Sequence, residues 1–205
     1  ISAYGEPDFS KKNIENKNVG SKNLINKSDY HLITDIKEID VWIKEAEEIG
    51  EIAVDTETSS LDPHQANLIG ISLSTKIGKA CYIPIGHKSK KCIDKDQVIK
   101  KLKPILEDPG IKKIGQNIKY DFIVFFKQGI ELTSLEDTML MSYVLDAGRN
   151  RHNLDTLAEI HLGHKTITFK DLVGTGKKEL NFSEVDIEKA KDYAAEDADI
   201  TLRLY

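Results

Sequence analysis

Four carboxylates in three separated short motifs are the residues of this chain whose types and spacing could do chemistry: Asp55, Glu57, Asp121 and Asp197. Each stands where an apolar residue is expected. Asp55 and Glu57 continue the apolar run 52–54, and the two-residue period of a strand places both on one face. Asp197 interrupts a helical stripe of small apolar residues, where burying an uncompensated polar group costs roughly 2 to 7 kcal/mol. Divalent metal ions would neutralise several such acids at once.

The spacing within the motifs would bring these acids together. Tyr193 precedes Asp197 by four residues, so both lie on one helix face a single turn apart. Asn117 and Asp121 have the same spacing, and we expect them on an earlier helix, with Asp121 beside the strand end of the first motif. Four hard carboxylates suit a pair of Mg²⁺ or Mn²⁺ ions roughly 3.5 to 4 Å apart, which serves phosphoryl displacement. Tyr193 is the natural candidate to orient the attacking water.

Other titratable residues fit this site less well. The six histidines show no HExxH or other zinc spacing, so we interpret them as surface or hydrogen-bonded structural residues. Glu196 and Asp199 are rotated away from the face of Tyr193 and Asp197 by roughly 100° per residue, and we expect them to face solvent or to stand behind the ligands. Without metal, the clustered acids should repel one another and titrate as a coupled set with some pKa values raised.

Hydrophobic periodicity predicts strands early in the chain and helices late. Strands are expected at 30–33, 52–57, 68–74, 80–84 and 112–115, and the second to fourth of them indicate an antiparallel meander. Helices are expected at 36–48, 94–106, 118–127, 137–145, 154–162 and 186–204. This order predicts an α/β fold in which a mixed sheet is flanked by helices.

Composition is typical of one soluble globular domain of 205 residues, with 40% hydrophobic and 31% charged residues. No apolar run approaches the roughly 18 residues of a membrane span. The two cysteines form no metal-binding pattern, which fits a reducing cytoplasm. A net charge of −5 argues against a broad grip on duplex nucleic acid but leaves a narrow grip on a few nucleotides open. Residues 1–28 are expected to be a flexible polar linker before a domain at 29–205.

Beyond the acids, four motifs occur in the order found in DEDDy 3′→5′ exonucleases: GQNIKYD at 115–121, DTML at 137–140, GHKTITF at 163–169 and YAAEDAD at 193–199. The combination resembles the proofreading domain of bacterial family A DNA polymerase I over residues 30–205. The resemblance implies a ribonuclease H-like fold, two divalent metal ions, Mg²⁺ or Mn²⁺, and hydrolysis of single-stranded DNA from its 3′ end to deoxynucleoside monophosphates. It also implies a monomer, with a polymerase domain in the same parent chain, in the bacterial cytoplasm near the nucleoid. No polymerase motif is present in these 205 residues.

The resemblance also implies roles for single residues. Asp55, Glu57 and Asp197 would hold the metal on the nucleophile side, Asp55 and Asp121 would share the second metal, and Tyr193 would position the water. Leu61 and Phe169 resemble the apolar residues that pack against terminal bases, where stacking is worth roughly 1 to 3 kcal/mol per base. Five more residues match positions that line the bound DNA strand in the family: Gln116, Asn117, Tyr120, Met139 and Arg151.

Two other interpretations remain open from the sequence. An exoribonuclease of the ribonuclease D kind would share the metal acids but accept the 2′-hydroxyl of RNA. A metal-free structural or DNA-binding module could have descended from an exonuclease that decayed. Decay usually removes ligands, and all four acids and Tyr193 are present here.

Overall fold

A six-stranded mixed sheet forms the centre of the computed structural model, which describes residues 29–88, 91–176 and 179–205. The residues expected to be a linker, 1–28, lie outside the described residues. The strands are β1 (Asp29–Leu32), β2 (Glu51–Thr58), β3 (Leu68–Lys76), β4 (Lys79–Pro84), β5 (Lys112–Gly115) and β6 (Leu135–Asp137). Their spatial order is β1-β4-β3-β2-β5-β6. Strands β2, β3 and β4 pair antiparallel, whereas β1 with β4, β2 with β5 and β5 with β6 are parallel. The expected meander and mixed sheet are therefore confirmed.

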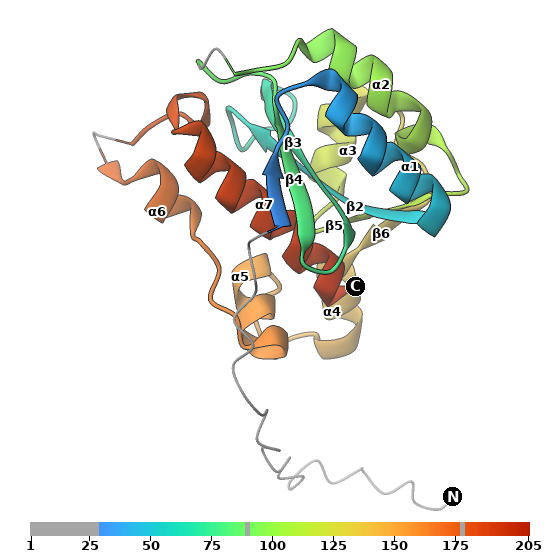
Figure 1. Ribbon diagram of the computed structural model, residues 1–205. Coiled ribbons are helices and arrows are strands. Elements are labelled where there is room, and N and C mark those ends of the chain that lie inside the picture. The colour runs from blue at the N-terminus through green and yellow to red at the C-terminus, as the bar shows by residue number, and fades with distance from the viewer. Residues whose placement is uncertain (1–28, 89–90, 177–178) are drawn as a thin grey trace, which may run out of the picture.

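Helices cover both faces of this sheet (Figure 1). One face carries α1 (Ile39–Ile49), which follows the 3₁₀ turn η1 (Ile36–Glu38), together with α2 (Lys95–Glu107) and α3 (Lys119–Phe126). The other face carries α7 (Ile187–Leu204), with α6 (Phe169–Val173) beside it. The remaining elements are α4 (Thr138–Asp146), α5 (Leu154–Leu157), the π-helical turn η2 (Ala158–Leu162) and the 3₁₀ turn η4 (Phe182–Glu184).

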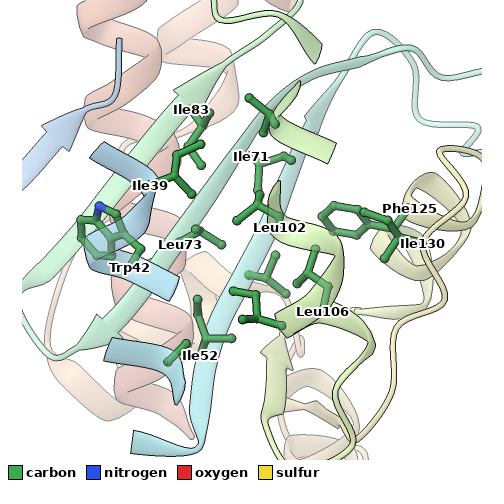
Figure 2. Close-up of a cluster of buried hydrophobic side chains, with 14 of the residues drawn as sticks. Ile39, Trp42, Ile52, Ile71, Leu73, Ile83, Leu102, Leu106, Phe125 and Ile130 are labelled. Atoms are coloured by element: carbon green, nitrogen blue, oxygen red, sulfur yellow. The ribbon is translucent and has the colours of Figure 1, made fainter. Parts of the chain in front are cut away.

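The main core lies between the sheet and the helices α1, α2 and α3 (Figure 2). Ile52 of β2, Ile71 and Leu73 of β3, Trp42 of α1 and Leu102 of α2 are all buried in it. Full burial of such a side chain contributes about 1.5 to 3 kcal/mol. The pleat therefore sends alternate residues of β2 into this core and leaves Ala53, Asp55 and Glu57 for the opposite face.

Helix α7 approaches that opposite face closely because both surfaces are made of small residues. Ala194 and Ala198 of α7 are fully buried, as are Ser72 and Ser74 of β3, and the two elements pack against each other. Because side chains alternate along β3, both serines lie on the other face of the sheet from the core residues Ile71 and Leu73. The close approach lets short carboxylate side chains of α7 and β2 meet.

Side-chain caps set the beginnings of several helices. Asp94 accepts from the Gln97 amide before α2, and Asp186 accepts from two amides at the start of α7. Asp137 caps α4 in the same way. These boundaries confirm the expected helices to within a residue or two. The expected helix at 154–162 is divided into α5 and η2, and strand β6 and helix α6 were not expected.

One expectation is wrong at the start of α3. Asn117 and Asp121 do not share a helix face, because Asn117 precedes the helix and adopts a φ of 61°. Asp137 accepts hydrogen bonds from the amides of Asn117 and Ile118, both at 3.1 Å, and so holds the turn in this conformation. Among the described helices, none is long and apolar enough to cross a bilayer.

Candidate active site

Three carboxylates from two elements meet where α7 crosses the end of β2. One oxygen each from Asp55, Glu57 and Asp197 lie within 4.8 Å of one another. Strand alternation places the first two on the face that α7 covers, and the helix supplies the third. The structure therefore brings together three of the four acids expected to bind metal.

The fourth acid, Asp121, approaches from α3 at the unpaired edge of β2. The ladder between β2 and β5 is paired from Glu51 to Ala53, so Thr56 lies beyond its end. Asp121 Oδ1 accepts the Thr56 amide at 3.0 Å and the Thr56 hydroxyl at 2.5 Å. The carboxylate thus takes the place of a neighbouring strand, which fixes it beside the other acids.

Burial makes this cluster electrostatically costly when it is fully ionised. Burial raises the pKa of Asp55 from its ordinary 3.8 to about 7. Burial also raises the pKa values of Glu57, Asp121 and Asp197, and the charge of Asp55 raises all three further. The expected raised pKa values of a metal-free cluster agree with this arrangement. Hard oxygen donors that hold protons in the absence of a cation form a suitable site for divalent ions.

Tyr193 stands next to the acids on the same helix face. A side-chain hydrogen bond links it to Asp197, and burial raises the pKa of its phenol well above the ordinary 10. Its ring lies 6.2 Å from the rings of Phe169 and Phe182, and those two stack on each other at 6.3 Å. The tyrosine is therefore a neutral hydroxyl held by an aromatic cluster.

A pocket of about 890 Å³ opens over these residues. Its lining includes Asp55, Glu57, Tyr193 and Asp197 together with the predicted strand contacts Leu61, Asn117, Tyr120 and Phe169. Leu61 is 94% exposed and Phe169 43% exposed, so both present apolar surface to the opening. The Tyr120 hydroxyl hydrogen-bonds to Thr58 and to the Ser60 carbonyl, which fixes its ring at the wall.

A family of known proteins matches most of this chain. The family model described as 3'-5' exonuclease matches residues 30–205. The chain belongs to that family. The expected resemblance to a 3′→5′ exonuclease domain is thereby confirmed.

Two curated relatives of this exonuclease domain are bacterial DNA polymerases I. That of Pseudomonas aeruginosa is 46% identical over 183 residues, which are 86% of this chain and 20% of that protein. That of Rhizobium leguminosarum is 44% identical over 199 residues, 87% of this chain and 20% of that protein. The domain thus spans about a fifth of the length of the curated relatives it matches.

A solved structure with the same fold is Escherichia coli RNase D, described as an exoribonuclease involved in structured RNA processing. Its TM-score is 0.62 at 22% identity, and the match covers 85% of this chain and 43% of that one. At this identity the likeness shows the shared fold alone.

Three residues predicted to line the bound DNA strand lie outside the pocket of the exonuclease domain. The Gln116 amide donates to the His152 carbonyl at 2.7 Å and its oxygen accepts from the Thr138 hydroxyl at 2.5 Å, so it joins β5 to α4. Met139 lies on α4 and Arg151 is exposed in the loop after it. Contact of these three residues with a DNA strand stays a prediction.

Several residues that line the pocket were not anticipated from the sequence. They are Asn153, Lys170, Thr175, Asn181 and Phe182. Lys170 adds a positive charge that suits phosphate, and buried Phe182 supports the rings of Phe169 and Tyr193. The motif GHKTITF indicated Phe169 but carried no signal for the loop that returns from α6 to α7.

The expectation that Glu196 and Asp199 could face solvent is wrong, because both are fully buried. Asp199 accepts from the Tyr30 hydroxyl at 2.7 Å and from the Gly78 amide at 2.7 Å, and also pairs with Arg203. It therefore anchors α7 to β1 and to the β3–β4 turn. Glu196 bonds a different segment, described below.

A second hollow, of about 820 Å³, lies between α3, β6 and α4. Its lining is mainly apolar, with Phe122, Leu140 and Val144 among its residues. Without a convergent set of polar groups it offers no chemistry comparable to the acid cluster.

Proposed function

We propose that this domain is a two-metal 3′→5′ exonuclease that hydrolyses single-stranded DNA from its 3′ end and releases deoxynucleoside monophosphates. The observation that carries the proposal is the meeting of Asp55, Glu57 and Asp197 within 4.8 Å on the floor of an open pocket. Membership of the 3'-5' exonuclease family supports it.

Divalent ions such as Mg²⁺ or Mn²⁺ fit the donor set, which consists of carboxylate oxygens alone. Asp55, Glu57 and Asp197 would hold one ion, and Asp55 with Asp121 would hold the second. When bound, such ions neutralise charge on the phosphate and lower the pKa of water, so that a nucleophile is available near neutral pH. The raised pKa values of the four acids support this assignment, because a cation offsets both burial and mutual repulsion.

Tyr193 would orient the water that attacks the terminal phosphodiester. Its raised pKa keeps the phenol protonated at neutral pH, so the oxygen can accept from water while the proton is directed to Asp197. The aromatic cluster with Phe169 and Phe182 restricts the ring. The role is positional, since the phenol neither gains nor loses a proton.

Apolar side chains at the pocket mouth would hold the last bases of the strand. Leu61 and Phe169 line the pocket from two separate segments of the chain, and exposed apolar surface is what an unpaired base can stack on. The last bases of a paired end are held in the duplex and must unpair before they can enter the pocket. Stacking of this kind would therefore favour a frayed or mispaired 3′ end over a paired one.

In a longer parent protein, the domain would act on 3′ ends that a polymerase domain of the same chain delivers, in the bacterial cytoplasm near the nucleoid. The bacterial DNA polymerase I relatives, of which the domain spans about a fifth, support this proposal. Residues 29–205 would constitute the exonuclease domain.

Digestion of labelled oligomers tests the proposal. A single-stranded DNA labelled at its 5′ end should shorten stepwise in Mg²⁺ or Mn²⁺ and stay intact with chelator or with the Asp55→Ala variant. A matched RNA oligomer measures the ribonuclease D-like alternative directly. Faster loss of RNA than of DNA would reject the substrate assignment, and an intact DNA in both metals would reject the activity.

A further inference from the structure

Glu196 lies beside the metal acids in sequence but faces away from them. It precedes Asp197 on α7 and is fully buried. Its two oxygens bond two points of one segment: Oε1 contacts His164 Nε2 at 2.8 Å, and Oε2 accepts the Ile167 amide at 2.7 Å. One turn of α7 thus carries a metal acid on one side and a two-point attachment on the other.

The attached segment leads directly into the pocket wall. It runs from Gly163, which ends η2 with a φ of 61°, to Thr168, which caps α6. Thr166 donates to Asp155 at 2.5 Å and so ties the segment to α5 as well. The next residue is Phe169, the first of α6 and one of the proposed base contacts.

We propose that Glu196 is a positioning residue that sets where the Phe169 ring stands relative to the metal acids. The inference rests on the exonuclease activity proposed above. Because Glu196 and Asp197 are neighbours on a rigid helix, the attachment fixes the base-stacking wall at a constant offset from the site of hydrolysis. A terminal base then finds its stacking surface at a fixed distance from the acids, so loss of the attachment weakens binding of the DNA strand.

A carboxylate suits this role better than an apolar side chain. Burying its charge is costly unless both oxygens receive good hydrogen bonds, and here each oxygen has its own partner. An apolar residue could fill the same space but would leave the Ile167 amide without this acceptor. The arrangement therefore fixes the geometry of the segment in addition to filling the space.

Asp199 offers a matched control on the same helix. It is also a fully buried carboxylate with hydrogen bonds to separate segments, but its partners are Tyr30, Gly78 and Arg203 and none of them lines the pocket. A substitution at Asp199 therefore shows the effect of losing a buried carboxylate in α7, and a substitution at Glu196 shows in addition the effect of losing the attachment to segment 163–168.

The first experiment measures amide hydrogen exchange at Ile167 in the Glu196→Met, Glu196→Gln and Asp199→Asn variants. Glu196→Met should speed exchange at Ile167 by about tenfold or more, since a buried amide loses its acceptor. Glu196→Gln keeps one acceptor oxygen and should restore part of the protection. His164→Ala, which keeps the Glu196 carboxylate, serves if Glu196→Met fails to fold. Unchanged exchange at Ile167 in both Glu196 variants overturns the proposal.

The second experiment measures base stacking in the pocket. A single-stranded DNA that ends in 2-aminopurine, whose fluorescence falls on stacking, is bound to the domain in the presence of Ca²⁺. Glu196→Met should weaken the quenching and raise the KM for hydrolysis in Mg²⁺ about five- to tenfold with little change in kcat, the range expected from impaired stacking of one base. Asp199→Asn should leave both unchanged. In a Phe169→Ala background the Glu196 substitution should add little.

Two results would contradict the inference. A fall in kcat at unchanged KM would mean that Glu196 acts through Asp197, and effects that add fully to those of Phe169→Ala would mean that it does not act through the ring. If the wild-type domain neither binds nor degrades the oligomer, the proposed activity fails, while amide exchange still decides whether Glu196 holds the segment.

Discussion

Thr56 donates both its backbone amide and its hydroxyl to the same oxygen of Asp121, at 3.0 and 2.5 Å. Each bond comes from a different part of one residue, so the carboxylate is held in direction as well as in distance. The residues on either side of Thr56 are Asp55 and Glu57, two of the proposed metal ligands. The strand therefore orients its own acids and the acid of a separate helix through three consecutive residues.

Thr56→Val keeps the shape and the amide bond but removes the hydroxyl donor to Asp121. We expect an affinity for Mn²⁺ about ten times weaker, in line with losses on removal of groups that support metal ligands. Isothermal titration with Mn²⁺ checks this. Thr75→Val is the matched control. The Thr75 hydroxyl donates to the Glu45 carboxylate at 2.6 Å, and neither Thr75 nor Glu45 lines the pocket. Equal affinities for the wild type and Thr56→Val would contradict the role of the hydroxyl.

Asp55→Asn should abolish hydrolysis and stabilise the metal-free domain at neutral pH. The folded-state pKa of Asp55, about 7, lies above its ordinary 3.8, so the stability contribution is complete below pH 3.8 and is lost as pH rises through 7. In the variant, the free energy of unfolding should fall by about 2 to 4 kcal/mol less than in the wild type as pH rises. Urea unfolding with chelator at pH 5 and pH 8 measures the difference, with exposed Glu47→Gln as control. A wild type equally stable at both pH values would contradict the expectation.

Tyr193→Phe should slow hydrolysis less than loss of a metal acid does. The variant keeps the ring within the aromatic cluster and removes only the hydroxyl that bonds Asp197. We expect kcat to fall roughly tenfold to a hundredfold, somewhat below the loss typical of a group that stabilises transition-state charge, with KM unchanged. Single-turnover digestion of a DNA oligomer measures it. An unchanged rate would mean that another group orients the water.

Leu61→Ala should weaken strand binding without affecting stability. The side chain is 94% exposed, so its removal costs little of the folding free energy, whereas a stacked base would lose its apolar partner. We expect KM for single-stranded DNA to rise about five- to tenfold. Ile77→Ala is the control, since that side chain is 64% exposed in the β3–β4 turn and does not line the pocket. Equal KM values for the two variants would remove Leu61 from the binding surface.

Ser72→Ala should stabilise the domain by about 1 kcal/mol, because it removes a buried hydroxyl that has no hydrogen-bond partner among the described residues. Ser72→Val should instead weaken Mn²⁺ binding, since Ser72 pairs with Asp55 and added methyl groups would push α7 outward. Ser74→Ala gives the contrast: its hydroxyl donates to the Lys79 carbonyl at 2.9 Å, so this variant should destabilise. Thermal unfolding measures the two alanine variants, for which stability changes of opposite sign are expected, and isothermal titration with Mn²⁺ measures Ser72→Val.

Local pattern was sufficient where one element decided the outcome. The alternation of β2 correctly placed Asp55 and Glu57 on one face, and the four-residue spacing correctly placed Tyr193 next to Asp197 on α7. Both predictions rest on the fixed geometry of a single strand or helix.

Prediction failed where a distant residue decides the local backbone. Asn117 and Asp121 have helical spacing, but the Asp137 carboxylate, twenty residues after Asn117, holds Asn117 in a left-handed turn. Rotation about α7 correctly directed Glu196 away from the metal acids, yet it could not show that segment 163–168 covers that side. Strand β6 has three residues, too few to show alternation.

Helix α7 carries the proposed water-orienting tyrosine, the attachment to segment 163–168 and a proposed metal ligand within five consecutive residues, Tyr193 to Asp197. Inserting or deleting one residue earlier in the helix would rotate all three by roughly 100° and move them by about 1.5 Å along the axis. The helix thus constrains length variation, whereas a change of length in the connection 59–67 between β2 and β3 would leave the acids in register.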